Sequence, residues 1–111
     1  MNTELQGYQR AALMKQAHHL EPVAHVGKSG LSPELAAHVD RELSQHELIK
    51  VRFSDFKAVK REITEQLGRD LGATLVAVIG NVGILYRPAP DPEDRRIEVP
   101  DRDTPTGREQ R

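Results

Sequence analysis

The segment Gly27-Lys28-Ser29-Gly30, in which two glycines frame a lysine and a serine, is the part of this sequence best suited to binding a ligand. Glycine lets the backbone take a positive φ and come close to a ligand, and Lys28 adds a full positive charge. A helix start is predicted directly after the segment, and its first amides could donate to an anion. The segment therefore suits a phosphate, either of a nucleotide or of an RNA backbone. A tight turn between a strand and a helix explains the same residues and stays open as an alternative.

Catalytic interpretations of this segment lack the residues that they require. A nucleotide-binding P-loop needs a glycine five positions before Gly27, where the sequence has Pro22. A hydrolytic triad of Ser29, His25 and Asp40 lacks the G-x-S-x-G turn that activates the serine. We therefore expect no catalytic residue, no cofactor and no small-molecule substrate.

The histidines do not form a recognisable metal site. There are five of them, and no H-E-x-x-H motif or cysteine accompanies them. His18 and His19 are adjacent, so on a helix their side chains point about 100° apart and cannot both chelate one ion unaided. They could instead contact phosphate beside Lys15, which lies one turn earlier. The sequence thus predicts no metal site and an extension of the phosphate contacts onto the first helix.

Hydrophobic periodicity predicts the elements that position these residues. Ser32 as N-cap, Pro33 in the first turn and the following acid Glu34 indicate a helix start just after the glycine loop. The predicted elements are a helix over residues 5–20, a strand over 22–26, a helix from 33 past 43, a strand over 47–53, a helix over 56–71 ending at Gly72, and strands over 74–79 and 82–87 joined at Gly80-Asn81. In the strand over 47–53, Ile49, Val51 and Phe53 share one face and Lys50 and Arg52 the other, and the apolar stripe of the helix over 56–71 begins at Phe56. The order α-β-α-β-α-β-β predicts an α/β fold with a mixed four-stranded sheet covered by helices.

Composition limits the domain and its surroundings. The chain has 111 residues, of which 37% are hydrophobic and 4% aromatic, enough for one domain with a modest core. It lacks cysteine, so disulfides and thiolate sites are excluded. No apolar stretch reaches the roughly 20 residues of a membrane helix, and the N-terminus does not resemble a secretion signal. We therefore expect a cytoplasmic protein that does not contact membranes.

Charge and proline content divide the chain at Arg87. Residues 1–87 contain 11 basic and 10 acidic side chains, whereas residues 88–111 contain 5 basic and 7 acidic ones and five of the seven prolines. The second segment has only Ile97 and Val99 as large aliphatic residues. So little apolar area cannot offset the entropy of ordering the chain, and we predict a disordered tail over residues 88–111 after a folded domain over residues 1–87.

Four blocks of sequence resemble the CRM-domain family, in particular the small bacterial YhbY-like proteins that associate with precursors of the large ribosomal subunit. The resemblance covers about residues 5–87. The blocks are Ala17-His18-His19-Leu20 followed by Pro22, Val26-Gly27-Lys28-Ser29-Gly30-Leu31, His46-Glu47-Leu48-Ile49-Lys50-Val51-Arg52, and Val78-Ile79-Gly80 leading to Leu85-Tyr86-Arg87. Their common order and spacing make the resemblance specific.

The resemblance implies a fold similar to the C-terminal domain of translation initiation factor three. It also implies that the G-x-x-G loop, here Gly27, Lys28, Ser29 and Gly30, contacts RNA, and that Arg10 corresponds to the family's arginine in the first helix. Family members often have a basic residue at the positions of Tyr8, Ala11, Met14, Glu21 and Asn81.

We therefore expect a monomeric RNA-binding protein that contacts structured ribosomal RNA in precursors of the large subunit. The expected contacts are Gly27, Lys28, Ser29, Gly30, Arg10, Lys15, His18 and His19. Because the sequence has only four aromatic residues, the protein should recognise RNA backbone and shape more than base identity. The alternative is a protein-interaction module that holds a ribosomal protein, in which the glycine loop is only a structural turn.

Overall fold

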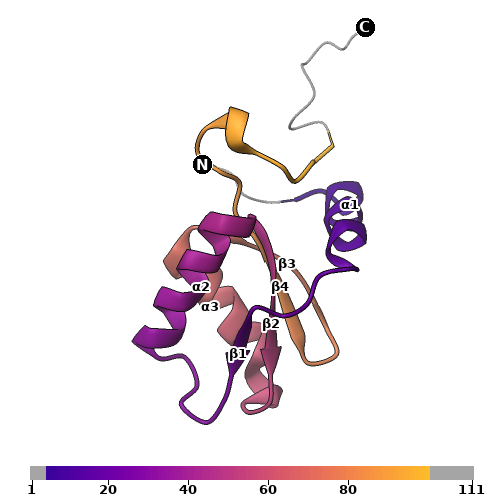
Figure 1. Cartoon of the computed structure of the whole chain (residues 1–111). Coiled ribbons are helices and arrows are strands. Elements are labelled where there is room, and N and C mark those ends of the chain that lie inside the picture. Colours follow the sequence, from indigo (N-terminus) through magenta and orange to yellow (C-terminus); the bar gives the residue numbers. More distant parts are fainter. Residues whose placement is uncertain (1–4, 101–111) are drawn as a thin grey trace, which may run out of the picture.

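The computed structural model describes residues 5–100 and shows a four-stranded sheet with helices on both faces (Figure 1). The elements in chain order are α1 (Gly7–Ala17), β1 (Ala24–Val26), α2 (Pro33–His46), β2 (Leu48–Phe53), the 3-10 turn η1 (Lys57–Val59), α3 (Lys60–Leu71), β3 (Thr74–Ile79), β4 (Val82–Tyr86) and the 3-10 turn η2 (Pro92–Asp94). The predicted order of helices and strands is confirmed.

The sheet is mixed, as predicted. Its strand order is β1-β2-β4-β3, with β1 parallel to β2 and the two remaining pairs antiparallel. The β3–β4 hairpin turns at Gly80, whose φ of +58° is a conformation that glycine adopts without strain. Strands β1 and β3 are therefore the two edges of the sheet.

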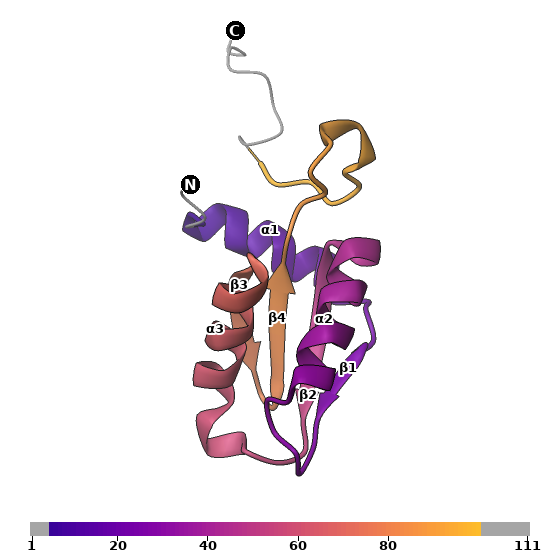
Figure 2. The same cartoon turned by 90° about the vertical axis from the view of Figure 1, so that its left-hand side faces the viewer.

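Helices α2 and α3 cover one face, and α1 crosses the other near one end of the sheet (Figure 2). On β2, the predicted alternation places Ile49, Val51 and Phe53 in the core beneath α2 and α3. The core beneath α1 contains Leu13, Ala17, Leu48, Val76, Ile84, Tyr86 and Val99. Each face of the sheet thus has its own hydrophobic cluster.

The predicted start of α2 and end of α3 are confirmed, whereas the predicted end of α1 and start of α3 are wrong, since α3 begins at Lys60 and not at residue 56. The Ser32 hydroxyl accepts from the Leu35 amide at 3.1 Å, and Gly72 ends α3 with a φ of +69°. Helix α1, predicted to reach Leu20, ends at Ala17. Beyond Ala17 the backbone bonds span three residues, from the His18 amide to the Lys15 carbonyl and from the Leu20 amide to the Ala17 carbonyl. Pro22 then keeps Glu21 out of helical geometry.

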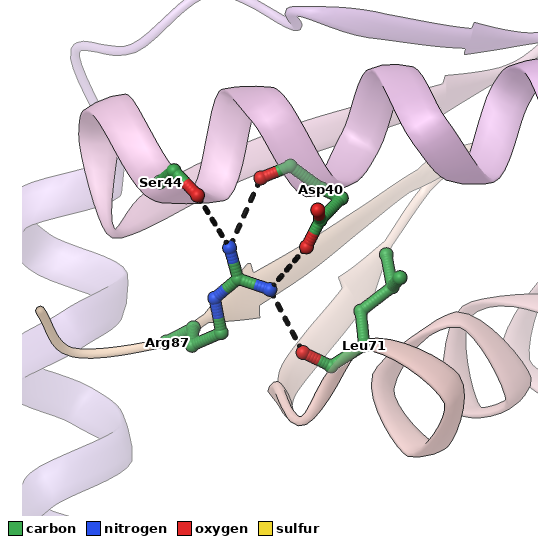
Figure 3. A network of polar contacts seen from close by, with 4 residues as sticks. All are labelled: Asp40, Ser44, Leu71 and Arg87. Atoms are coloured by element: carbon green, nitrogen blue, oxygen red, sulfur yellow. Dashed lines mark hydrogen bonds and ion pairs between the residues drawn. The ribbon is translucent and has the colours of Figure 1, made fainter. Parts of the chain in front are cut away.

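Arg87 joins α2, α3 and the end of β4 (Figure 3). Its Nη1 donates to Asp40 Oδ1 at 2.6 Å and to the Leu71 carbonyl at 2.8 Å. Its Nη2 donates to the Asp40 carbonyl at 3.0 Å and to Ser44 Oγ at 2.9 Å. One guanidinium therefore fixes the C-terminal turn of α3 against α2, at the end of the sheet away from the glycine loop.

Residues 88–100 form a strap that packs on the domain, which corrects the predicted disordered tail for this part of the chain. Val99 is 1% exposed and lies in the core beneath α1. The strap also meets α1 directly, since Gln9 Nε2 donates to the Pro100 carbonyl and Gln16 Nε2 to the Glu98 carbonyl. Residues 101–111, the remainder of the predicted tail, lie outside the described residues.

A buried carboxylate holds the start of this strap. Glu47 is 4% exposed and has a φ of +64°. Its Oε2 accepts from the Ala89 amide at 2.7 Å, and its Oε1 accepts from the Arg96 and Ile97 amides at 2.8 and 3.0 Å. Such charge-assisted bonds to backbone amides compensate for the small apolar area of the segment.

Candidate nucleic-acid interface

The glycine segment forms a closed turn with two exposed side chains. The Gly30 amide donates to the Gly27 carbonyl at 3.0 Å, and Gly30 has a φ of +63°. Lys28 and Ser29, between them, are exposed. Gly30 is buried beneath Phe56, because a Cβ added to it would lie 3.1 Å from Phe56 Cε2. The turn therefore has a fixed backbone and presents Lys28 and Ser29 outward.

The chain after β2 lies directly against this turn. The Ser54 and Asp55 amides donate to the Val26 carbonyl at 3.1 and 3.3 Å. Phe56 was expected on the buried stripe of the third helix, but it precedes η1 in a left-handed conformation and is 47% exposed. It covers the glycine turn and not the core. Lys57, exposed beside it, therefore lies close to the turn.

The β3–β4 hairpin completes the same end of the sheet. The Asn81 carbonyl accepts from the Phe53 amide at 2.8 Å, and Asn81 Oδ1 accepts from Lys60 Nζ at 3.1 Å. We call this region, made of the Gly27–Gly30 turn, residues 54–60 and the Gly80-Asn81 hairpin, the loop end. It carries Lys28, Lys57 and Lys60. Both views place its three segments at one end of the molecule (Figures 1 and 2).

Two helices begin at the loop end. The N-termini of α2 and α3, with their positive partial charge, both lie there (Figure 2). The expectation that free amides of α2 would bind phosphate needs correction, because Pro33 has no N–H and the Leu35 amide is bonded to Ser32. Glu34 in the first turn also lowers the positive potential. The turn and the lysines, more than the helix amides, are the groups that can attract an anion.

The predicted site residues of α1 are only partly brought to the loop end. Arg10 Nη1 donates to the Val76 carbonyl at 3.0 Å and to the Leu75 carbonyl at 3.4 Å. Both carbonyls belong to β3, the edge strand farthest from β1. Arg10 therefore joins α1 to β3, and the structure does not bring it to the glycine turn.

Lys15, His18 and His19 lie at the C-terminal end of α1 and are all exposed. The rings of His18 and His19 meet edge to face, 5.2 Å apart. His18 also lines a hollow on the sheet with Lys50 and Val82, and Val82 follows the hairpin of the loop end. Of the α1 candidates, His18 thus lies on the sheet surface that leads to the glycine turn.

Sequence reasoning missed Arg52 as a candidate residue. It is exposed on β2, on the face opposite Ile49 and Val51, and its partner across the sheet is Val82 of β4. The strand alternation carried this signal, because Lys50 and Arg52 were expected on the face away from Phe53. Phe56 was missed because its spacing matches the apolar stripe of the following helix.

The residues considered for a hydrolytic triad do not assemble. His25 Nε2 lies 2.8 Å from Ser54 Oγ, whereas Ser29 is on the outside of the glycine turn. Asp40 is bonded to Arg87. Within residues 5–100, no group of three or more His, Asp or Glu side chains is placed to hold a metal ion. No helix in that range is long and apolar enough to cross a membrane.

Comparison with known proteins gives a consistent result. Residues 5–87 match the family model of the CRS1 / YhbY (CRM) domain. The chain is 35% identical over 99 residues to an RNA-binding protein of Haemophilus influenzae, a match that covers 88% of this chain and 97% of that one. It is 34% identical over 97 residues to the probable RNA-binding protein YqeI of Bacillus subtilis, covering 86% and 99% of the two chains.

A solved structure extends this likeness to the fold. The solution structure of a hypothetical protein from Staphylococcus aureus superimposes with a TM-score of 0.74 at 32% sequence identity. The match covers 87% of this chain and the whole of that one.

Proposed function

The chain belongs to the CRS1 / YhbY (CRM) domain family, and from this premise we propose that it binds RNA through the loop end of its sheet. The phosphates of a structured RNA dock against the Gly27–Gly30 turn, where Lys28 supplies charge and the glycine backbone allows close approach. Lys57 and Lys60 extend the contact along the neighbouring segment. The protein acts as a monomer and by binding alone, with no catalytic step.

The continuity of the loop end supports this proposal most directly. The Phe56 ring lies on Gly30, and the two amides that follow β2 bond to the last residue of β1. These contacts make the lysine-bearing segment and the glycine turn one surface, so several phosphates of one RNA can be neutralised together. A turn that served only to reverse the chain would not need exposed lysines both on itself and on the segment that packs against it.

The RNA that we propose is ribosomal RNA in precursors of the large subunit, bound in the cytoplasm. The resemblance of the four sequence blocks to YhbY-like proteins supports this choice. Crosslinking in growing cells, followed by sequencing of the attached RNA, tests it when Lys28→Glu is run beside the unchanged protein. Reads that gather on large-subunit precursor RNA and fall with Lys28→Glu are expected. Reads spread evenly over cellular RNA would contradict the ribosomal assignment.

The contact itself is tested by RNA affinity in vitro. If about four phosphates are neutralised, a slope of about 0.7 per phosphate predicts roughly a fifty-fold loss of affinity between 50 and 200 mM salt. Lys28→Glu should weaken binding to all structured RNAs about equally while the melting temperature stays unchanged. Arg69→Glu is the matched control, because Arg69 is exposed in the last turn of α3, away from the loop end.

Two results would overturn the proposal. One is the lack of any salt-sensitive affinity for folded RNA at low ionic strength. The other is a Lys28→Glu variant that melts at a lower temperature and binds RNA as before, which would identify the turn as structural.

The alternative protein-interaction module would use the groove of about 1000 Å³ along the β3 edge, lined by Arg10, Arg61 and Arg69. A ribosomal protein retained after nuclease treatment, independently of Lys28, would favour that module.

A further inference from the structure

A small hollow lies at the loop end, on the sheet face that α1 leaves uncovered. It has a volume of about 390 Å³ and is lined by Pro22, His25, Arg52, Phe53, Ser54, Lys57, Asn81 and Val82. That volume is at the lower end of the range for small-molecule sites, so it admits a group of the size of one nucleotide and excludes a helix. His25 is two residues before Gly27, so the hollow adjoins the glycine turn.

The walls of the hollow combine cations with an apolar surface. Arg52 and Lys57 are exposed at its rim, and none of its lining residues is acidic. Pro22 and Val82 provide apolar surface between them. A charged rim over an apolar wall suits a ligand with a negative charge at one end and a flat, weakly polar body, which is the chemistry of a nucleotide.

The remaining lining groups can form directional hydrogen bonds. Asn81 Oδ1 accepts from Lys60 Nζ, so its amide nitrogen is the group that Asn81 can offer to a ligand. His25 Nε2 is paired with Ser54 Oγ at 2.8 Å, which fixes the imidazole and leaves its other nitrogen available for hydrogen bonding. Both groups match the acceptors and donors on the edge of an unpaired base.

We propose that this hollow receives one unpaired nucleotide of the bound RNA. Its phosphate lies between Arg52 and Lys57, its base lies against Pro22 and Val82, and Asn81 contacts the base edge. The inference rests on the proposed RNA binding and deepens it. The glycine turn holds the backbone of a structured RNA, and the hollow selects structures in which a bulged or looped-out nucleotide lies next to the bound phosphates.

Two hairpin RNAs that differ by a single bulged nucleotide test this inference. The affinity of the full chain for the bulged hairpin is compared with its affinity for the same hairpin without the bulge, at low and constant salt. The unchanged protein should prefer the bulged RNA by about tenfold, the effect of a good charge-assisted contact. Arg52→Gln should abolish this preference, so that the variant binds the two hairpins with affinities within about twofold of each other.

A second variant and two controls complete the test. Asn81→Asp conserves the shape of the side chain but replaces the amide donor with an acceptor and places an acid in the hollow, so it too should remove the preference. Arg69→Gln, which has the same change of charge as Arg52→Gln at a distant exposed site, should conserve it. Lys28→Glu should weaken binding to both hairpins alike.

The outcomes separate this inference from the function on which it rests. If the unchanged protein binds both hairpins equally, or if Arg52→Gln reduces both affinities to the same extent, the hollow does not select an unpaired nucleotide and the inference is wrong. In either case a Lys28→Glu effect would leave the proposed function standing. If neither hairpin is bound in a salt-sensitive manner, both proposals fail together.

Discussion

Replacement of Arg87 should destabilise the domain and leave its RNA affinity unchanged. Its guanidinium is bonded to Asp40, Ser44 and the Leu71 carbonyl, and its side chain is only 21% exposed. Arg87→Ala would leave the last carbonyls of α3 without this cationic donor and would separate α2 from α3 at that end. RNA binding at the loop end, at the opposite end of the sheet, should not depend on it.

The size of the effect follows from these contacts. A hydrogen bond to a charged group is worth about 1.5–3 kcal/mol, and several bonds from one side chain are not additive. The ion pair with Asp40 adds at most about 0.5 kcal/mol, because the Asp40 side chain is 52% exposed. We therefore expect Arg87→Ala to lower the free energy of unfolding by about 2–3 kcal/mol, which corresponds to a fall of about 10–20 °C in the melting temperature.

Urea unfolding and thermal melting measure this loss, and two further variants divide it. Asp40→Asn should cost about 0.5 kcal/mol or less, since the Ser44 and Leu71 bonds remain. Arg87→Lys should cost about half as much as Arg87→Ala, because a single ammonium nitrogen cannot replace a two-nitrogen fork. The reasoning is refuted if Arg87→Ala melts within about 2 °C of the unchanged protein. A stable Arg87→Ala variant that has lost RNA affinity would show a direct RNA contact instead.

Three other substitutions test particular contacts. Glu47→Ala should cost about 2–4 kcal/mol, because it removes three charge-assisted bonds from a buried carboxylate to part-buried strap amides, and should speed hydrogen exchange over residues 89–97. Gly83→Ala places a Cβ 2.5 Å from Thr64 Oγ1 and should cost about 2 kcal/mol. Urea unfolding of the double variant with Thr64→Ala should recover part of that loss, and strictly additive costs would contradict it. Gly30→Ala, at φ +63° beneath Phe56, should cost about 1–2 kcal/mol and weaken RNA binding at a temperature where the variant is folded, so unchanged affinity would argue against the turn as the contact.

The local features of the fold could be predicted from the sequence because they depend on neighbouring residues. Ser32 before Pro33, Gly72 after the last turn of α3, and the Gly80-Asn81 hairpin each satisfy a backbone requirement within a few positions. The alternation along β2 likewise separated its core face from Lys50 and Arg52. Together these features fixed the element order, and the mixed sheet followed from it.

The strap and the role of Arg10 could not be predicted in this way. Glu47 bonds to residues 42 to 50 positions later in the chain, and Arg10 to a carbonyl 66 positions away. Such contacts leave no trace in local periodicity. Residues 88–97 consist mostly of charged residues and proline, and the carboxylate that holds them, Glu47, lies in a different part of the sequence. Phe56 was misplaced for the converse reason, since its spacing fits the helix that begins only after it.

The candidate site likewise depends on contacts between residues that are distant in the sequence. Lys28, Lys57 and Lys60 are spread over 33 residues of sequence, and their proximity depends on the parallel pairing of β1 with β2. The G-x-x-G spacing identified the turn, but the hollow formed by His25, Arg52 and Asn81 needs three strands to be placed side by side. Sequence reasoning could therefore find the first part of the site and not the second.

The bond between Gln9 and Pro100 brings the two ends of the described chain together, away from the loop end. A short linker between residues 5 and 100 could therefore join the described ends in a circular permutant, with new ends opened elsewhere on the surface. For the same reason, a tether attached beyond Pro100 would leave the glycine turn facing outward on a sensor chip or bead. A mechanical force applied to both ends would act first on the contacts between the strap and α1 and only then on the sheet.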